Sequence, residues 1–255
     1  MLFLLLPLSL FVVACDPTLP PLRGQIEIGE EPYAVFVGGG ALNSDLYAVH
    51  PEGGTPIPIT FTNVAETRPA LSADGRRLAF LRGSSLEDST PATVWVMNLR
   101  SGSERELQLP KGAGRPRQVA WERGGNAIIV ATEEELYRLN PPPGRPEAEQ
   151  LDDAERAVAE SSLAVLLGDP VFTRVVPCEN PRDLCLVAAS GRSGLLANAV
   201  RDPVRWGPDS VGFFVGDRLQ IRPLRRGRPR LLLMTDAPER PREATFFPGR
   251  PGRDQ

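Results

Sequence analysis

The sequence has few of the side chains that most often carry enzyme chemistry. His50 is the single histidine, and there are three cysteines in 255 residues. A Ser-His-Asp arrangement therefore has only one candidate base. His50 lies after a short apolar stretch, at the position that Asn98 and Asn140 hold in similar segments. We therefore expect that His50 is a turn residue and that the protein is not an enzyme.

Motifs for nucleophilic serine, phosphate and calcium are also missing. The chain has no Gly-x-Ser-x-Gly elbow, and the glycine-rich stretch at Gly38 is not followed by Lys-Ser/Thr. No Asp-x-Asp-x-Asp-Gly loop occurs, and Asp74-Gly75 is typical of a tight turn. We therefore expect no catalytic residues, no cofactor and no metal site.

Lysine is almost absent, since Lys111 is the only one and the other basic residues are arginines. The net charge of −3 gives no overall attraction to nucleic acid, so we expect no such partner. From Arg201 onward there are twelve arginines and seven acidic residues. This excess indicates either a basic face for anionic lipid or an acidic partner, or a solubilising turn around 222–230, which we favour.

The sequence has one long apolar run, Leu2–Val13, which is too short to span a bilayer and is interrupted by Pro7. It predicts the core of a secretory signal over residues 1–14. The residues Val12-Val13-Ala14-Cys15 resemble the lipobox of bacterial lipoproteins. The resemblance implies that Cys15 carries diacylglycerol and becomes the N-terminus, although no Lys or Arg precedes the run. An ordinary secretory signal with a chance cysteine is the alternative.

The lipobox resemblance also bears on the residues that follow Cys15 and on the other two cysteines. Residues 15–24 are proline-rich and predict a lipidated tether. With Cys15 lipidated, Cys178 and Cys185 remain as an even pair in an exported, oxidising compartment. They flank a turn signal at Asn180-Pro181, so we expect a disulfide, with two free buried thiols as the alternative.

The 27 prolines and 24 glycines predict many turns and short elements, and the segments between them repeat. Five similar segments can be aligned with one another. One aligned position holds Tyr47, Trp95, Tyr137, Cys185 and Gln220, which are 48, 42, 48 and 35 residues apart in turn. Upstream of them, "PALSADGRRLAF" matches segments starting at Gln118 and Pro203, which aligns Leu71, Trp121 and Trp206. Each repeat reads as four short strands, and a four-stranded period of 40 to 50 residues is typical of a β-propeller blade.

We therefore predict an all-β fold, a β-propeller of about five four-stranded blades over residues 25–247. An incomplete or degenerate six-bladed ring stays open as an alternative. The first strand is expected at Gln25–Ile28, and "EATFFPG" near the end is expected to close the first sheet. The aligned aromatic residues should fill the wedges between blades. Residues 248–255 should form a disordered tail. A short helix is expected between the third and fourth blades, with Leu151, Ala154 and Val158 on one face.

The stretch "RPALSADGRRLAFLRG…TVWVMNLRSGSERELQL" resembles the WD-like repeat of TolB-type propellers, with Leu71 in place of tryptophan and Ala73 in place of proline. The resemblance implies the fold but says little about function. We expect a monomeric lipoprotein, held by membrane lipid at Cys15 on the extracytoplasmic, periplasmic side of the cell envelope. Its propeller should bind or scaffold an envelope protein, peptide or glycan. The alternatives are a propeller enzyme with an axial acidic site and a vestigial structural propeller.

Overall fold

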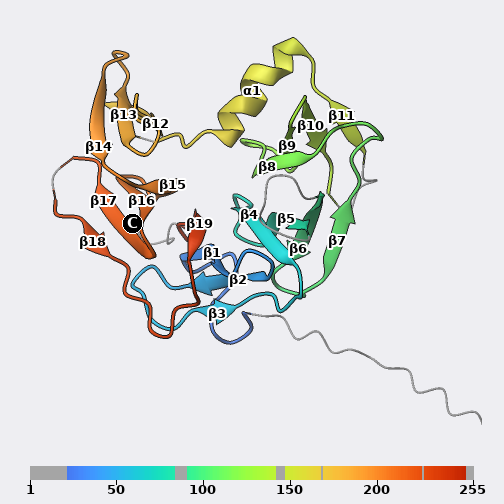
Figure 1. Ribbon diagram of the computed structural model, residues 1–255, viewed down its shortest axis with the longest axis horizontal. Coiled ribbons are helices and arrows are strands. Elements are labelled where there is room, and N and C mark those ends of the chain that lie inside the picture. The colour runs from blue at the N-terminus through green and yellow to red at the C-terminus, as the bar shows by residue number, and fades with distance from the viewer. Residues whose placement is uncertain (1–21, 84–90, 142–146, 168, 226, 251–255) are drawn as a thin grey trace, which may run out of the picture.

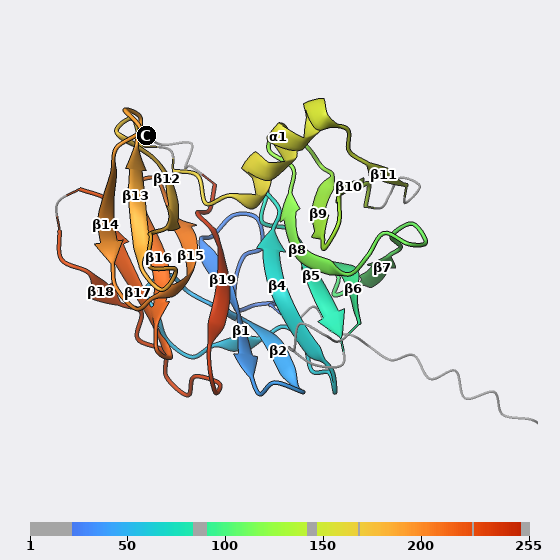
Figure 2. The same cartoon turned by 45° about the horizontal axis from the view of Figure 1, so that its top comes forward.

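Short antiparallel strands fill most of the computed structural model, which describes residues 22–250 except 84–90, 142–146, 168 and 226 (Figure 1). The strands form blades around a central axis (Figure 2). The first blade contains β19 (Arg242–Phe247), β1 (Tyr33–Gly39), β2 (Ser44–Val49) and β3 (Ile57–Pro58). The second contains β4 (Ala65–Leu71), β5 (Arg77–Gly83), β6 (Ala92–Asn98) and β7 (Glu104–Leu107). One parallel bridge, between Ser44 and Ala65, links these two blades.

The remaining strands form three further blades. The third contains β8 (Pro116–Trp121), β9 (Ile128–Thr132), β10 (Leu136–Leu139) and β11 (Ala148–Gln150). The fourth contains β12 (Phe172–Pro177), β13 (Leu184–Ala188) and β14 (Ser193–Ala197). The fifth contains β15 (Arg201–Trp206), β16 (Ser210–Val215), β17 (Arg218–Pro223) and β18 (Arg230–Leu231).

The fourth blade keeps a remnant of the inner strand that the others have. Leu166 forms an antiparallel bridge with Arg174 of β12, and the N–H of Leu167 donates to the carbonyl of Thr173 at 2.8 Å. Residues 165–167 thus occupy the inner position of this blade, which explains why its first strand is hard to detect in the sequence. The prediction of about five blades is confirmed.

The ring is closed by the last strand of the chain. β19 pairs antiparallel with β1, so that Tyr33 lies opposite Phe247, and takes the inner position of the first blade. The expected closing role of this segment is therefore confirmed. The expected first strand at Gln25–Ile28 is wrong, because these residues are turns in which the N–H groups of Gln25 and Ile26 both donate to the carbonyl of Leu22.

Both expected boundaries of the propeller also shift. Leu22 is fully buried, so the folded part extends into the segment 15–24 that was expected to be a tether. Residues 248–250 are not a free tail, since the N–H of Arg250 donates to the carbonyl of Glu30 at 2.9 Å. The rest of the expected tail, residues 251–255, lies outside the described residues.

Apolar clusters fill the spaces between neighbouring blades, and the aromatic columns lie in them. Trp121 packs in the cluster between the second and third blades, and its Nε1 donates to the carbonyl of Ala70 at 2.8 Å. Trp206 packs between the fifth and first blades, stacked on Phe246 at 4.4 Å between ring centroids. Large rings bury much apolar area, so these positions hold the blades together.

A helix, α1 (Asp153–Leu163), follows the third blade in the chain and packs on β8 and β9 of that blade (Figure 1). Asp152 caps its N-terminus by accepting from the N–H of Glu155. The predicted helix is present, but only one residue of its predicted apolar face is buried. Leu151, just before the helix, packs on the third blade with Ala159, whereas Ala154 and Val158 are exposed. No helix within the described residues is long and apolar enough to cross a membrane.

Candidate functional site: the axial cavity and its mouth

A cavity of about 510 Å³ lies where the inner strands meet at the axis. All five blades contribute to its lining. The lining residues lie on the inner strands β4, β8, β15 and β19, on β12 and at the end of α1 and just after it. Much of the lining is apolar: Pro69, Val119, Val165, Val175, Pro203 and Ala244. Three charged residues interrupt it: Arg68, Asp202 and Glu243.

These three charged residues share an unusual backbone conformation. Arg68, Asp202 and Glu243 have φ of 54°, 52° and 49°, the left-handed region that non-glycine residues seldom adopt. Each lies at a bulge in an inner strand, where the register with the next strand shifts. Such a conformation costs roughly 1–3 kcal/mol per residue, so the surrounding contacts must hold it in place.

The contacts run from blade to blade around the axis. The N–H of Arg68 donates to Oε2 of Glu243 at 2.7 Å, and the N–H of Glu243 donates to Oδ2 of Asp202 at 3.3 Å. The guanidinium of Arg68 also pairs with Oε1 of Glu243 at 3.4 Å. Arg68 and Glu243 thus each direct their N–H group to a carboxylate of the neighbouring blade, and the two axial acids join blades five, one and two.

A second cavity of about 470 Å³ opens beside the first and shares Arg68 and Glu243 with it. We call this cavity the mouth, and the face of the ring on which it opens, where the inner strands begin, the mouth face. Four arginines line the mouth: Arg68, Arg115, Arg117 and Arg242. Glu243 lines it as well, and Glu133 forms an ion pair with Arg117. Arginine is therefore the commonest side chain in the lining of the mouth.

Arg242 is held by two backbone carbonyls. Its Nη1 donates to the carbonyls of Gly39 at 3.1 Å and Arg240 at 3.0 Å, which fixes the guanidinium. Its Nη2 is enclosed and has no hydrogen-bond partner within the part of the chain that the structure describes. Burial lowers the pKa of Arg242. An enclosed cationic donor without an acceptor is costly.

A buried ionic network supports the strand that carries Arg68. Glu66 on β4 is fully buried and accepts from Nε and Nη2 of Arg82 at 2.9 and 2.6 Å. Thr60 donates to the other carboxylate oxygen of Glu66. Arg82 also pairs with Glu104 at 2.8 Å. Burial raises the pKa of Glu66, against the opposing effects of Thr60 and Arg82.

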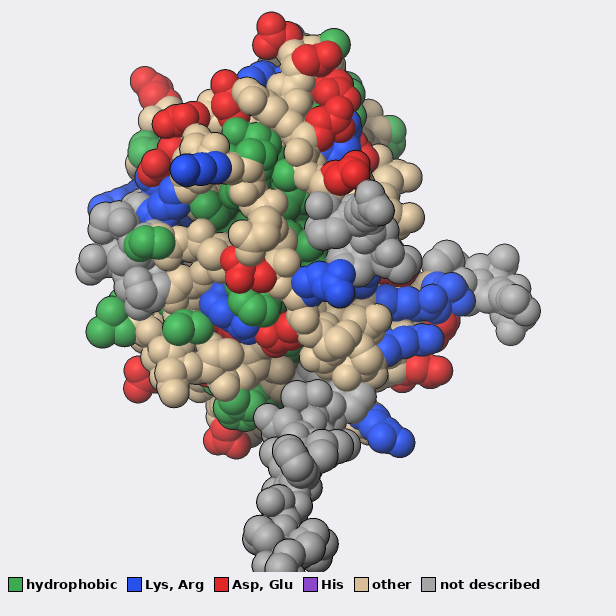
Figure 3. All heavy atoms as spheres, turned by 90° about the vertical axis from the view of Figure 1, so that its right-hand side faces the viewer, with side chains coloured by type: hydrophobic (Ala, Val, Ile, Leu, Met, Phe, Trp, Pro, Cys, Tyr) green, Lys and Arg blue, Asp and Glu red, His purple; other side chains and the backbone are tan. Residues whose placement is uncertain are grey.

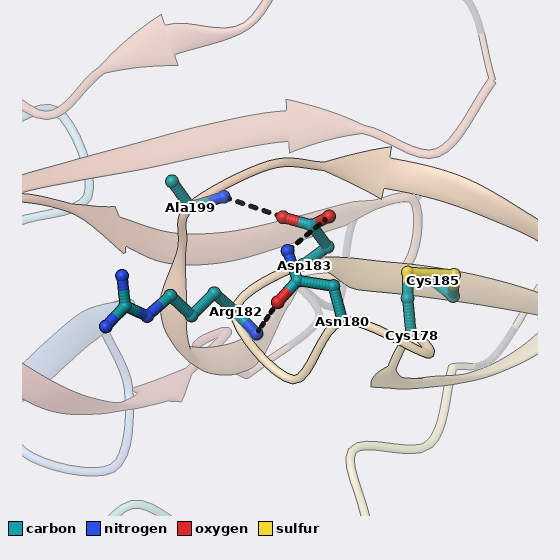
Figure 4. The surroundings of a disulfide bond; sticks show 6 residues. All are labelled: Cys178, Asn180, Arg182, Asp183, Cys185 and Ala199. Carbon is teal, nitrogen blue, oxygen red and sulfur yellow. Dashed lines mark hydrogen bonds between the residues drawn. A yellow bond between two sulfur atoms is a disulfide. The ribbon is translucent and has the colours of Figure 1, made fainter.

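The two predicted disulfide cysteines lie at the turn between β12 and β13, where a disulfide joins Cys178 and Cys185 (Figure 4). Asp183 in this turn accepts at its Oδ1 from the N–H of Ala199 at 3.0 Å, which ties the turn to the connection into the fifth blade. Cys15, the predicted lipid attachment residue, lies outside the described residues.

The other sequence candidates lie away from the axis. His50 is exposed in the turn after β2, and Asp74 accepts from the hydroxyl of Ser72 at 2.6 Å within its own turn. Among the described residues no group of three or more His, Cys, Asp or Glu side chains could hold a metal ion.

Sequence reasoning missed the axial charges. A usable signal existed, because Arg68-Pro69 and Asp202-Pro203 place a charged residue before proline in equivalent inner strands. A proline inside a strand marks a bulge or an edge.

No family model matches the chain. A curated relative, the uncharacterized peptidase YuxL of Bacillus subtilis, is 27% identical over 119 residues, which cover 46% of this chain and 16% of that protein. TolB from Acinetobacter baumannii has a similar structure, with a TM-score of 0.39 and 13% identity over 84% of this chain and 66% of that one. A chain of a nidogen/laminin complex has a TM-score of 0.47 and 10% identity over 84% of this chain and 98% of that one. This chain thus spans a small part of YuxL and just under two thirds of TolB.

Proposed function

We propose that this protein is an exported lipoprotein, held at a membrane through Cys15, whose propeller binds an envelope partner and carries out no chemistry. The signal-like run and the lipobox-like residues before Cys15 support export and lipidation. The pair Cys178 and Cys185 suits an oxidising compartment outside the cytoplasm.

The observation that carries this proposal is where the chain enters the ring. Leu22 packs with Leu99, which follows β6, and Tyr33 donates to the carbonyl of Gly75 in the turn between β4 and β5. Both turns lie on the face opposite the mouth face, which we call the turn face. An anchor at Cys15 would therefore hold the turn face near the membrane and leave the mouth face free for a partner.

The axial acids support a binding role more than a catalytic one. Asp202 and Glu243 do line the axial cavity, which would suit a propeller enzyme with an acidic site. However, both accept hydrogen bonds that link neighbouring blades, so their presence has a structural reason. A purely vestigial propeller is less well supported, because two shaped cavities with a constrained arginine lie at the axis.

The lipid anchor is tested by replacing its attachment residue. Cys15→Ser should abolish labelling by radioactive palmitate and release the protein from the membrane fraction, because the thioether to the lipid can no longer form. As a matched control, the double variant Cys178→Ser/Cys185→Ser should stay labelled and membrane-bound, since Cys15 is then the only cysteine. Unchanged labelling or fractionation of Cys15→Ser would refute the anchor.

A further inference from the structure

Arginines are concentrated on the turn face of the fourth and fifth blades. In each blade the first and third strands run from the mouth face to the turn face, so the turns that follow them lie on the turn face. Arg192 lies in the turn between β13 and β14, and Arg225 and Arg228 lie in the connection between β17 and β18. Arg205 is close to the end of β15, the inner strand of the fifth blade. All four residues are exposed, and we call them the basic surface.

Little of this positive charge is neutralised by carboxylates of the same turns. Asp169 and Asp209 are the acidic residues in the described parts of these turns. Asp169 pairs with Nε of Arg225 at 3.0 Å, and its side chain is only 7% exposed. The other three arginines of the basic surface form no ion pair with any residue that the structure describes. Their guanidinium groups therefore keep accessible N–H donors.

Negative charge is gathered on another part of the ring. Figure 3 shows Asp and Glu side chains gathered over the side of the molecule that carries α1 and the third blade. Asp153 and Glu155 lie in the first turn of α1, and Glu149 on β11 is exposed. At physiological salt the field of each group reaches only about 8–10 Å. The basic surface can therefore attract an anionic surface although the net charge of the chain is −3.

The basic surface lies on the face that the proposed anchor turns towards the bilayer. Leu22 packs with Leu99 beside the turn face, and Cys15 precedes Leu22 by seven residues. Phosphate groups accept charge-assisted hydrogen bonds from guanidinium groups, often two at once. The exposed arginines are thus on the side of the molecule where lipid headgroups would lie.

We propose that the basic surface binds anionic lipid headgroups and forms a second, electrostatic contact between the propeller and the membrane. This inference rests on the proposed anchoring for the orientation of the ring, and it adds the class of lipid. A bilayer is favoured over an acidic protein because the anchor brings a bilayer to this face. Each arginine near an anionic bilayer should strengthen binding about fivefold.

Vesicle sedimentation tests the proposal independently of the anchor. The protein used is residues 16–255, which contain the whole described fold and lack the apolar run and Cys15. It is mixed with rising amounts of vesicles made of equal parts of phosphatidylglycerol and phosphatidylcholine, or of phosphatidylcholine alone. We expect binding to the anionic vesicles only, and we expect added salt to weaken it because salt screens the charges.

Variants then locate the contact. Arg192→Gln/Arg228→Gln removes two charges that have no ion pair to lose, so the fold should be retained, as circular dichroism checks. This change should weaken binding to the anionic vesicles about 30-fold. The matched control Arg105→Gln/Arg218→Gln removes the same charge from exposed positions on β7 and at the mouth end of β17, and it should leave binding unchanged.

Three results would overturn the proposal: no binding to the anionic vesicles, equal binding to both kinds of vesicle, or equal loss of binding in the two double variants. The arginines would then serve solubility or an acidic protein partner. Palmitate labelling at Cys15 tests the anchor separately, so a failure of the lipid contact can be told apart from a failure of the anchor.

Discussion

At the scale of single residues, Asp169 joins the fourth blade to the fifth. Its Oδ1 accepts from the N–H groups of Val171 at 2.7 Å and Phe172 at 3.0 Å, and its Oδ2 pairs with Nε of Arg225 at 3.0 Å. Arg225, in the turn after β17, belongs to the neighbouring blade. These contacts, with Arg225 the largest cause, lower the pKa of Asp169 to about 2.

We expect Asp169→Asn to make the stability less dependent on acid pH. Because the pKa of Asp169 is lowered on folding, its stabilisation is fully present above its usual value of 3.8 and is lost as the pH falls through about 2. Urea unfolding should therefore show a lower free energy of unfolding for the variant at pH 7 and a difference that shrinks between pH 4 and pH 2. Asp236→Asn, an exposed control, should show no such trend. A difference that stays constant over this range would contradict the account.

The residue scale is also where the sequence was least informative. The aromatic residues Trp121 and Trp206 could be placed between blades because they recur at a fixed spacing and are apolar. The pair of Arg68 and Glu243 could not, because its partners are 175 positions apart and come together only when β19 closes the ring. The charge before proline recurs at Asp202 but not in every blade, so periodicity alone does not predict which residue pairs with Arg68.

At the scale of elements, the disulfide closes the turn between β12 and β13. Its Cα atoms lie 5.2 Å apart, and the turn it closes also binds the connection into β15 through Asp183. The fourth blade has the shortest inner strand of the ring, reduced to residues 165–167. The disulfide thus lies in the blade whose inner strand is shortest.

Removing this link should destabilise the protein. In the chain-entropy account, a loop this short contributes about 2–3 kcal/mol, so Cys178→Ser/Cys185→Ser should lower the free energy of unfolding by about that amount. Reductant should lower the stability of the wild-type protein similarly and leave the double variant unchanged. Alkylation of the native protein without reductant should leave both cysteines unmodified. Rapid labelling of both would show that no disulfide forms.

Elements could be predicted well where the repeat is regular and poorly where it is not. The hairpin around Asp74-Gly75 has apolar strands on both sides of a turn, and it forms β4 and β5. The helix could be predicted from its composition, but not the face it buries. Ala159 is buried, and Val158 is not, because the helix packs on the third blade at an angle that the sequence does not specify.

At the scale of the whole molecule, ring closure fixes which face a partner can reach. Seven residues lead from Cys15 to Leu22, and they span at most about 25 Å. Because Leu22 is fixed beside the turn face, the proposed lipid at Cys15 would keep that face towards the membrane. Two exposed apolar side chains lie on the other side: Leu42 in the turn between β1 and β2, and Phe61 in the connection into β4.

The central claim is that a partner binds at the mouth face, and site-specific photocrosslinking in intact cells tests it most directly. A benzophenone side chain at Phe61, on the mouth face, should give a discrete crosslinked species. The same group at Arg192, exposed in the turn after β13 on the turn face, should give none. Crosslinking from position 192 and not from position 61, or from neither, would contradict the account.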